Sequence, residues 1–354
     1  MLGVPQPIVR PGRGGVVRRG YRLPYVSESV APTDDAVPRR GYRRAQAAGP
    51  REKTVEELLQ TLIIAVIAGS FYSLIALGMV LVYRTTGVLN IAHGGIGVLC
   101  GFVAWDLITL RHVPYYLGVL TGIVVAVLLG LGFERIVIRR LAGRPDLQTI
   151  STLALFILAE GFVFIVPWWG NTWGQLFPSP LLDKTVRIPL ANYSVTYDQV
   201  VLLVATAAVF AGLAFLLRRT RLGMAMRAIS DDGTAARLMG VRSRLISPVV
   251  WGLAFGLSGL TTMLLAPILF LDNQSLTGLT LKALTVTFIG GLVSLPLTVA
   301  GAMTLATLEA ISQVYFPGAK GLADAWPFIL LVLVLAARYA RHRSSFEDHA
   351  VVRA

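Results

Sequence analysis

The stretch Tyr83–Leu99 reads YRTTGVLNIAHGGIGVL and interrupts a long apolar run with an asparagine, a histidine and four glycines. It lies close to where a membrane-spanning helix that begins near Leu58 should end. Non-helical backbone is tolerated at membrane depth only where it is buried in protein or lines a wet cavity, because lipid offers no hydrogen bonds. The stretch therefore predicts a broken or re-entrant helical element near residues 90–100 that is buried in protein or lines a wet cavity.

The composition of the whole chain indicates that lipid is its solvent. Hydrophobic residues make up 55% of it and charged residues 14%, whereas a soluble domain carries about 25% charged residues. A helix needs roughly 20 apolar residues to cross a bilayer. Apolar runs recur at Leu58–Val82, Tyr116–Phe133, Ile150–Trp169, Gln199–Leu217, Ile246–Leu271 and, shorter, at Trp326–Ala337. We predict an all-α polytopic membrane protein with about eight transmembrane helices.

Three regions differ in composition along the chain. Residues 1–57 are rich in Arg, Pro and Gly and contain no apolar run, so we expect a disordered tail rather than a cleavable signal peptide. A tail that binds anionic lipid headgroups is the alternative. Residues 58–340 form the predicted transmembrane domain, with a cytoplasmic loop at 218–245, and residues 341–354 form a short cytoplasmic tail.

The net charge of +13 is concentrated in arginine blocks between the apolar runs, at residues 135–144, 218–244 and 338–343. This is the positive-inside pattern of a membrane protein rather than a groove for nucleic acid, so all three blocks should be cytoplasmic. Gly170–Asp198, whose charges balance, should face outside. If Gly94–Leu110 crossed the membrane, the arginine-rich tail would lie outside, against the rule; we therefore favour a broken element that leaves the tail inside.

Motifs of self-contained catalysis are absent from the sequence. It has no GxxxxGK[ST] phosphate loop, no HExxH and no GxSxG, and its single cysteine, Cys100, permits neither a disulfide nor a CxxC metal site. We expect no enzyme activity, no metal and no cofactor on this chain, so that any driving chemistry takes place elsewhere.

A second informative segment is TRLGMAMRAISDDGTAARLMGVRSRLI, residues 220–246. Ser230 is expected to cap a helix with Asp231 and Asp232 in its first turn, and Gly240 is placed to end it. Asp232, Ala236 and Gly240 are four residues apart and would share one face. Such a face of small residues suits docking into a groove of another protein, although an ordinary surface helix remains the alternative.

Three motifs carry a family resemblance. GMVLVYRTTGVLNIAHGGIGVLCGFVAW resembles the N-terminal signature of the permease subunits of branched-chain amino-acid ABC importers, through Asn90, Ala92, His93 and Gly94. TRLGMAMRAISDDGTAARLMGV, residues 220–241, is similar to the family's coupling segment, which docks on the ATPase, through Thr220, Arg221, Gly223, Arg227, Ala228, Ala236, Leu238 and Gly240. FIGGLVSLPLTVAGAMTLATLEA resembles a later glycine-rich segment through Gly290, Gly291, Ser294, Pro296, Gly301 and Glu309. The resemblance covers roughly Leu58 to Arg338.

The resemblance implies the permease subunit of an ATP-driven importer in the cell membrane, forming the translocation path for branched-chain amino acids or a related small solute. A second homologous permease, two cytoplasmic ATPase subunits that bind the ATP, and an extracytoplasmic solute-binding protein would be its partners, with lipid around it. The alternative is an ion-coupled secondary transporter that uses Glu160 and Asp106. Val293, Leu297 and Ala302 stand where the family usually has glycine, and Glu160 where a neutral polar residue is usual, so the solute stays open.

The predicted functional residues form two sets. The path and helix-break set is Asn90, His93, Gly94, Gly95, Glu160, Gly290, Gly291, Ser294 and Pro296, and the ATPase-coupling set is Arg227, Asp231, Asp232, Ala236 and Gly240. We expect Asn90 to hydrogen-bond freed backbone groups or to face water, and no side chain to fit at Gly94. For His93 a hydrogen-bonded structural role is favoured over contact with solute, and for Glu160 the pathway and a structural role stay open.

Overall fold

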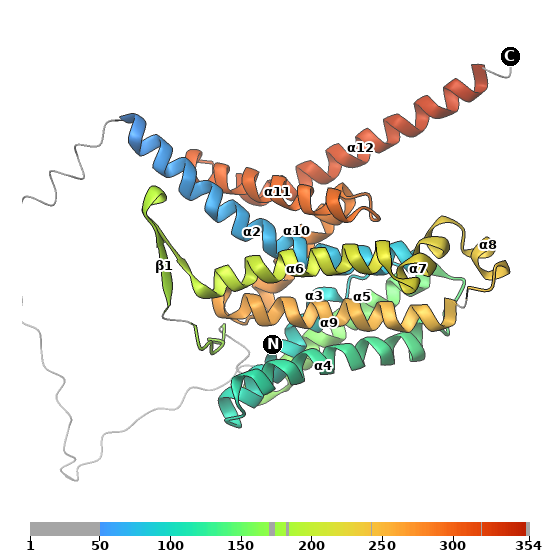
Figure 1. The fold of residues 1–354 in the computed structure, drawn as a ribbon, viewed down its shortest axis with the longest axis horizontal. Coiled ribbons are helices and arrows are strands. Elements are labelled where there is room, and N and C mark those ends of the chain that lie inside the picture. Colours follow the sequence, from blue (N-terminus) through green and yellow to red (C-terminus); the bar gives the residue numbers. More distant parts are fainter. Residues whose placement is uncertain (1–49, 170–173, 182–183, 242, 320, 352–354) are drawn as a thin grey trace, which may run out of the picture. The chain divides into compact units, whose positions relative to one another are not determined.

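A computed structural model describes residues 50–169, 174–181, 184–241, 243–319 and 321–351 (Figure 1). The helices are α2 (Pro50–Thr86), α3 (His93–Trp105), α4 (Tyr115–Phe133), α5 (Pro145–Ile165), α6 (Tyr197–Arg219), α7 (Arg221–Asp231), α8 (Gly233–Leu238), α9 (Ser243–Leu269), α10 (Asn273–Ile289), α11 (Leu295–Tyr315) and α12 (Leu322–Val351). Single π-helical segments extend α3 over Asp106–Leu110 and α4 over Glu134–Ile138. Short 3₁₀ turns lie at Pro167–Trp169 and Pro189–Ala191.

The only sheet among the described residues is an antiparallel hairpin of β1 (Thr185–Ile188) and β2 (Tyr193–Thr196). Thr185 is opposite Thr196, and Ile188 is opposite Tyr193. The hairpin belongs to the segment 170–198 that the sequence assigns to the outside.

Eight helices in the described part of the chain are long and apolar enough to cross a membrane, counting α3 together with its π extension as His93–Leu110. The apolar part of α10, Leu276–Ile289, is shorter. A polytopic helical membrane protein with about eight transmembrane helices is therefore confirmed.

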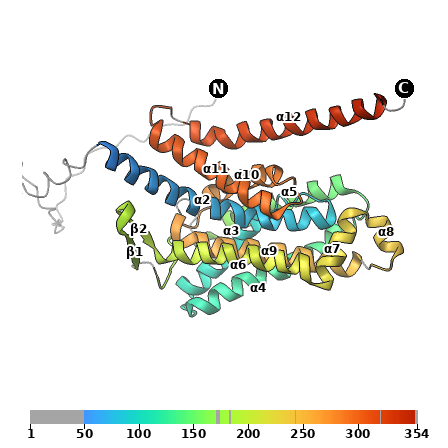
Figure 2. The ribbon, with the colours of Figure 1, turned by 45° about the horizontal axis from the view of Figure 1, so that its top comes forward.

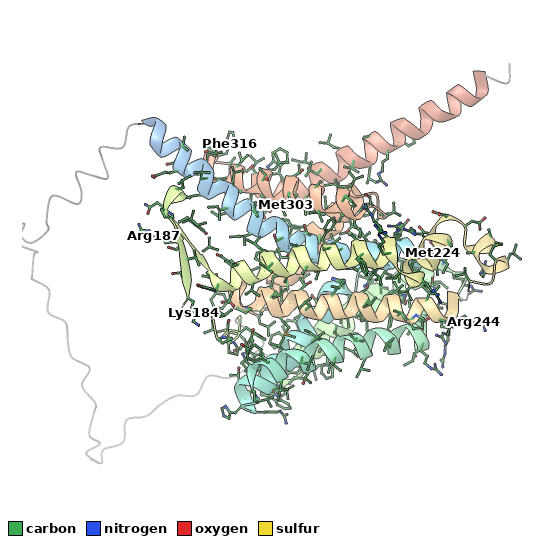
Figure 3. The ribbon with its side chains drawn as sticks, viewed as in Figure 1. Lys184, Arg187, Met224, Arg244, Met303 and Phe316 are labelled. Carbon is green, nitrogen blue, oxygen red and sulfur yellow. The ribbon has the colours of Figure 1, made fainter. Side chains whose placement is uncertain are left out.

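The helices lie side by side and define two ends of a bundle (Figures 1 and 2). We call one the hairpin end, where β1, β2 and the start of α2 lie, and the other the coupling end, where α7 and α8 lie. The arginine blocks gather at the coupling end: Arg139 Nη2 donates to the main-chain oxygen of Arg244 at 3.3 Å, and Arg338 Nη2 approaches Gly291. Figure 3 places Arg244 at this end and Arg187 on the hairpin at the other.

The direction of α2 differs from the expectation that the N-terminal tail enters the bundle on the same side as the arginine blocks. Gln60 Nε2, near the start of α2, donates to Ala191 O at 2.8 Å, so α2 begins at the hairpin end. At the far end of α3, Trp105 Nε1 donates to Leu176 O at 3.2 Å, so the chain does return to the hairpin end after the break. Because α3 completes that passage, the chain enters α2 from the end opposite the arginine blocks. The tail 1–49 itself lies outside the described residues.

Two boundaries also differ from those predicted. The first helix begins at Pro50 rather than at Leu58, and α12 continues to Val351 rather than ending near 340. Apolar side chains mark only the part of a helix that lies in lipid. The backbone hydrogen bonds of a helix do not require apolar side chains, so they continue into the polar residues on either side.

Helix α2 is the centre of the bundle although its sequence is as apolar as a lipid-facing helix. Leu74, Leu77 and Val80 are fully buried. It packs on α11, α9 and α10. A β-carbon at Gly69 would come within 2.6 Å of the Sδ atom of Met303 in α11, which is labelled in Figure 3. Helices α4, α5, α6 and α12 instead expose apolar side chains outward, as lipid or a partner subunit requires.

Candidate functional site

The chain breaks where the sequence indicates. Helix α2 ends at Thr86, Gly87 adopts φ +70°, and residues 87–92 lead back into the bundle before α3 begins at His93. Asn90 is 0% and His93 1% exposed. His93 packs against Gly78, which at 1.5 Å per residue lies about 12 Å before the end of α2. The helical break is therefore a turn buried inside the bundle, and a solvated loop is excluded.

Thr152 of α5 satisfies the backbone that the break frees. Its Oγ1 lies 2.9 Å from Leu89 O and 3.2 Å from Ile91 N, on either side of Asn90. The sequence analysis missed this residue. A threonine in an apolar span is a weak signal, because threonine commonly bonds a carbonyl of its own helix, as Thr152 also does with Thr149 O.

Of the two roles expected for Asn90, a hydrogen bond to the freed backbone is not the one that the structure shows. Both amide atoms, Oδ1 and Nδ2, are buried and have no hydrogen-bond partner among the described residues. A buried amide without partners costs about 1–3 kcal/mol. Such a group in a native fold calls for a functional explanation or a bound water.

The imidazole of His93 is held by shape rather than by hydrogen bonds. A β-carbon at Gly78 would come within 2.2 Å of Cε1, and both ring nitrogens are buried without a partner in the described structure. The main-chain oxygen of His93 accepts a hydrogen bond from Ser258 Oγ of α9. The sequence analysis favoured a structural histidine held by hydrogen bonds, whereas the ring of His93 forms none with the described residues.

Gly94 and Gly95 allow the start of α3 to approach two other helices. A β-carbon at Gly94 would lie 1.9 Å from Thr280 Oγ1 of α10, and one at Gly95 would lie 2.9 Å from Phe156 Cδ2 of α5. No side chain fits at Gly94 without displacing α10, as predicted.

We call His93, Gly94, Ser258 and Thr280 the constriction. The cavity between them leaves about 10 Å³ for the centre of a water molecule, which is room for about one water. Five further residues line it: Ile75, Thr261, Thr262, Leu265 and Leu276. This cavity is too small for any solute of amino-acid size.

Glu160 lies one helical turn from the constriction, toward the hairpin end. Its Oε1 accepts a hydrogen bond from Thr277 Oγ1 of α10, three residues before Thr280. Glu160 is half-buried. The carboxylate therefore joins α5 to α10 beside the constriction.

Gly290, Gly291, Ser294 and Pro296 do not join the constriction. They form the turn between α10 and α11 at the coupling end, where Gly291 adopts φ +73° and Ser294 Oγ accepts from Leu297 N at 3.4 Å. A β-carbon at Gly290 would lie 2.0 Å from Thr298 Oγ1. The predicted path set is thus divided between two places.

The coupling segment contains two helices instead of one. Asp232, not Ser230, caps the second: its Oδ1 accepts from Thr234 N at 2.8 Å and Ala235 N at 3.0 Å. These backbone hydrogen bonds, that of Ala235 first, lower the pKa of Asp232. Ser230 and Asp231 are the last residues of α7, which is capped by Thr220.

The three residues of the predicted small-residue face differ in exposure: Asp232 and Gly240 are exposed, and Ala236 is buried. Ala236 is buried in the protein, and Gly240, at φ +86°, has open space around it and serves the turn. The most exposed large apolar side chains of this segment are Leu238 and Met239, at 84% and 85%. We call these two residues the coupling tip. Of the residues at this spacing, Ala236 therefore packs inside the chain, and the docking role predicted for the others stays a prediction.

A pocket of about 780 Å³ at the coupling end brings members of both predicted sets together. It is lined by Arg227 and Asp231 of α7 and by Ser294 and Pro296 at the start of α11. Arg84, at the end of α2, also lines it and donates from Nη1 to Val293 O at 3.3 Å. The turn 290–296 therefore belongs with the coupling segment.

Two charged clusters lie elsewhere in the bundle. Lys282 Nζ is 3.1 Å from Glu309 Oε1 and 3.5 Å from Asp324 Oδ1, and Tyr72 OH donates to Glu309 Oε2 at 2.5 Å. At the hairpin end, Asp106 accepts from Trp168 Nε1 at 2.9 Å, from Trp169 Nε1 at 3.3 Å and from Arg111 Nε at 2.9 Å.

Comparison with known proteins gives a consistent set of similarities. Residues 61–335 match the family described as branched-chain amino acid transport system, permease component. The chain is 28% identical over 292 residues to the high-affinity branched-chain amino acid permease BraD of Pseudomonas aeruginosa, covering 79% of this chain and 94% of BraD. It is 26% identical over 292 residues to LivH of Escherichia coli K12, covering 78% and 92%. It is 28% identical over 238 residues to the autoinducer 2 import permease LsrC of Escherichia coli DH10B, covering 66% and 64%.

Proposed function

We infer the working role of the protein from one premise: this chain belongs to the family of permease components of branched-chain amino acid transport systems. It is a transmembrane permease of an ABC importer and works with other transporter subunits. The main observation in support of a mechanism is the helical break. It places the buried polar groups of Asn90 and His93, which have no hydrogen-bond partner among the described residues, beside the constriction.

The solute that we propose is a branched-chain amino acid or a closely related small solute. The similarity to BraD and LivH extends over nearly their whole length, which supports this class. The constriction would open by separation of α3 from α10, because Gly94 and Thr280 are the surfaces in closest approach there. The amide of Asn90 and the imidazole of His93 would then gain the solute or water as a hydrogen-bond partner.

The proposed assembly contains a second homologous permease, two ATPase subunits and an extracytoplasmic solute-binding protein. The ATPase subunits bind the ATP, and this chain carries no catalytic group for it. The exposed coupling tip supports docking of an ATPase, since exposed leucine and methionine side chains outside the lipid favour a protein contact. Nucleic acid is not an expected partner.

We propose that movement passes from the tip to the break through packed helices. Helix α8 follows α7, α7 packs on α2, and α2 ends where the broken segment begins. A rigid-body displacement of α7 would therefore move the end of α2 relative to α3.

The proposed location is the cell membrane, with the coupling end and the C-terminus cytoplasmic. The gathering of the arginine blocks at that end supports this orientation. A cysteine at Val186 should react with an impermeant maleimide on intact cells, and a cysteine at Leu238 only after permeabilisation. Both side chains are exposed, whereas the native Cys100 is buried and should stay silent. Reversed labelling would refute the orientation.

The function itself is tested by reconstitution in proteoliposomes. With its ATPase and binding protein, the chain should take up labelled leucine, isoleucine or valine only when ATP is supplied. Leu238→Asp with Met239→Asp should abolish uptake while membrane insertion persists, because a charged tip does not fit an apolar groove. Uptake by this chain alone, driven by an ion gradient, would overturn the proposal.

A further inference from the structure

A second pocket, of about 550 Å³, opens at the coupling end. Helices α2 and α7 line both pockets but with different residues, and they line this one with Thr85, Thr86 and Ile229. Its volume is that of sites that hold small ligands, about 300–1,000 Å³. None of the functions above uses it.

The charged groups of this pocket leave an excess of positive charge. Glu134 is buried, and its Oε2 accepts from Arg139 Nη2 at 3.1 Å, so that one carboxylate is already neutralised by one guanidinium. Arg139 Nε is buried without a hydrogen-bond partner in the described structure. Arg244 lines the same pocket, is exposed, and has no side-chain partner among the described residues. Unused guanidinium donors favour a carboxylate or another small anion.

The remaining wall is partly aliphatic. Ile138 and Ala142, which follow α4, and Ile229 of α7 line the pocket. A ligand that places a carboxylate at Arg244 would have an aliphatic surface available for its other end. Branched-chain amino acids combine these two features.

We propose that this pocket binds the imported amino acid on the cytoplasmic side and that its occupancy slows transport. The proposal rests on the solute class proposed above. The pocket is walled by the end of α2, the π segment of α4, α7 and the start of α9. A ligand that bridges Arg244 of α9 and Ile229 of α7 stabilises the arrangement in which it fits, and so opposes the movement of α7 that coupling needs.

The test uses the complete importer in proteoliposomes that contain ATP. Vesicles are preloaded with increasing unlabelled L-leucine, and the initial rate of uptake of external labelled leucine is divided by the rate without preloading. The parent rate should fall several-fold. Arg244→Gln should need at least about tenfold more internal leucine for the same inhibition, as expected for loss of a charge-assisted hydrogen bond. Ala142→Phe, which fills the pocket without a change of charge, should also weaken the inhibition.

Arg140→Gln is the matched control. Arg140 is exposed at the same end, does not line the pocket, and loses the same charge. Uptake by the Arg140→Gln variant should be inhibited by the same concentration of internal leucine as uptake by the parent. Arg139 is unsuitable for this purpose because its removal would leave the buried Glu134 carboxylate unpaired.

Three outcomes would overturn the proposal. Uptake in the parent that internal leucine does not slow, or equal slowing in the parent, Arg244→Gln and Ala142→Phe, refutes the pocket and leaves the proposed function intact. Slowing that follows the phosphatidylglycerol content of the vesicles rather than internal leucine assigns the pocket to lipid phosphate. A parent with no ATP-driven uptake of any branched-chain amino acid refutes the proposed solute, and this inference with it.

Discussion

The imidazole of His93 lies on the backbone of Gly78, where a β-carbon would come within 2.2 Å of Cε1. This contact holds the first residue of α3 against α2 at a point eight residues before α2 ends. The start of the broken helix is therefore positioned by close packing between two helices rather than by hydrogen bonds of the ring.

Gly78→Ala tests that contact. The added methyl group must displace His93, and overpacking of this kind costs about 1–3 kcal/mol. We expect lower thermal stability in detergent and reduced ATP-driven uptake with normal membrane insertion. Gly212→Ala in α6 is the control, because a β-carbon there meets no atom within 4 Å. Equal behaviour of the two variants would show that the contact has no role.

Thr152→Val keeps the shape of the side chain and removes the hydroxyl that serves Leu89 O and Ile91 N. Leaving these backbone groups unpaired should lower the free energy of unfolding by about 1–3 kcal/mol. Amide hydrogen exchange in residues 87–92 should accelerate. Thr121→Val on the exposed face of α4 loses only a bond to Leu117 O of its own helix and should change neither measurement.

Asn90→Leu should separate stability from transport. Both amide atoms are buried without a partner in the described structure, so an apolar side chain of similar size removes an energetic cost. We expect an equal or higher melting temperature together with a loss of uptake, as is usual where function requires an unfavourable group. A destabilised variant would mean that Asn90 is hydrogen-bonded through ordered water.

The Lys282–Glu309 pair should show strong coupling between its two members. Their side chains are 22% and 6% exposed. Lys282→Met alone leaves the Glu309 carboxylate without its cation and should cost about 3–5 kcal/mol. The added change Glu309→Gln should recover most of that loss, measured by thermal unfolding. Asp324→Asn, at a side chain 81% exposed, should have little effect. Additive losses in the double variant would contradict an ion pair.

Asp232 should make the first turn of α8 sensitive to acid. Backbone hydrogen bonds lower its pKa, so its ionised form stabilises the folded helix. That stabilisation is present above the ordinary pKa of aspartate and is lost as the pH falls through the lowered pKa. Exchange protection of the Thr234 and Ala235 amides, corrected for intrinsic rates, should decrease over this range. Asp232→Asn should show no such decrease, since asparagine caps a helix without titrating.

Much of this architecture follows from the sequence. Runs of about 20 apolar residues predict spanning helices because lipid cannot satisfy an exposed backbone. The arginine blocks indicate which loops share one side, and the structure brings Arg139 and Arg244 together. Asn90, His93 and Gly94 mark the break, because a polar and glycine-rich interruption is costly in lipid unless the protein surrounds it. The family resemblance was also visible in three motifs and is confirmed by the match over residues 61–335.

The tertiary structure alone decided which groups meet. Apolar composition is the same whether a helix faces lipid or other helices, so only packing shows that α2 is central and begins at the hairpin end. A four-residue spacing looks alike on an external and an internal face, and only the structure shows that Ala236 is buried while Asp232 and Gly240 are exposed. Thr152 and Arg244 become meaningful only when α5 meets the break and α9 meets α4. Periodicity describes one helix at a time, whereas a site is made by side chains that the sequence keeps far apart.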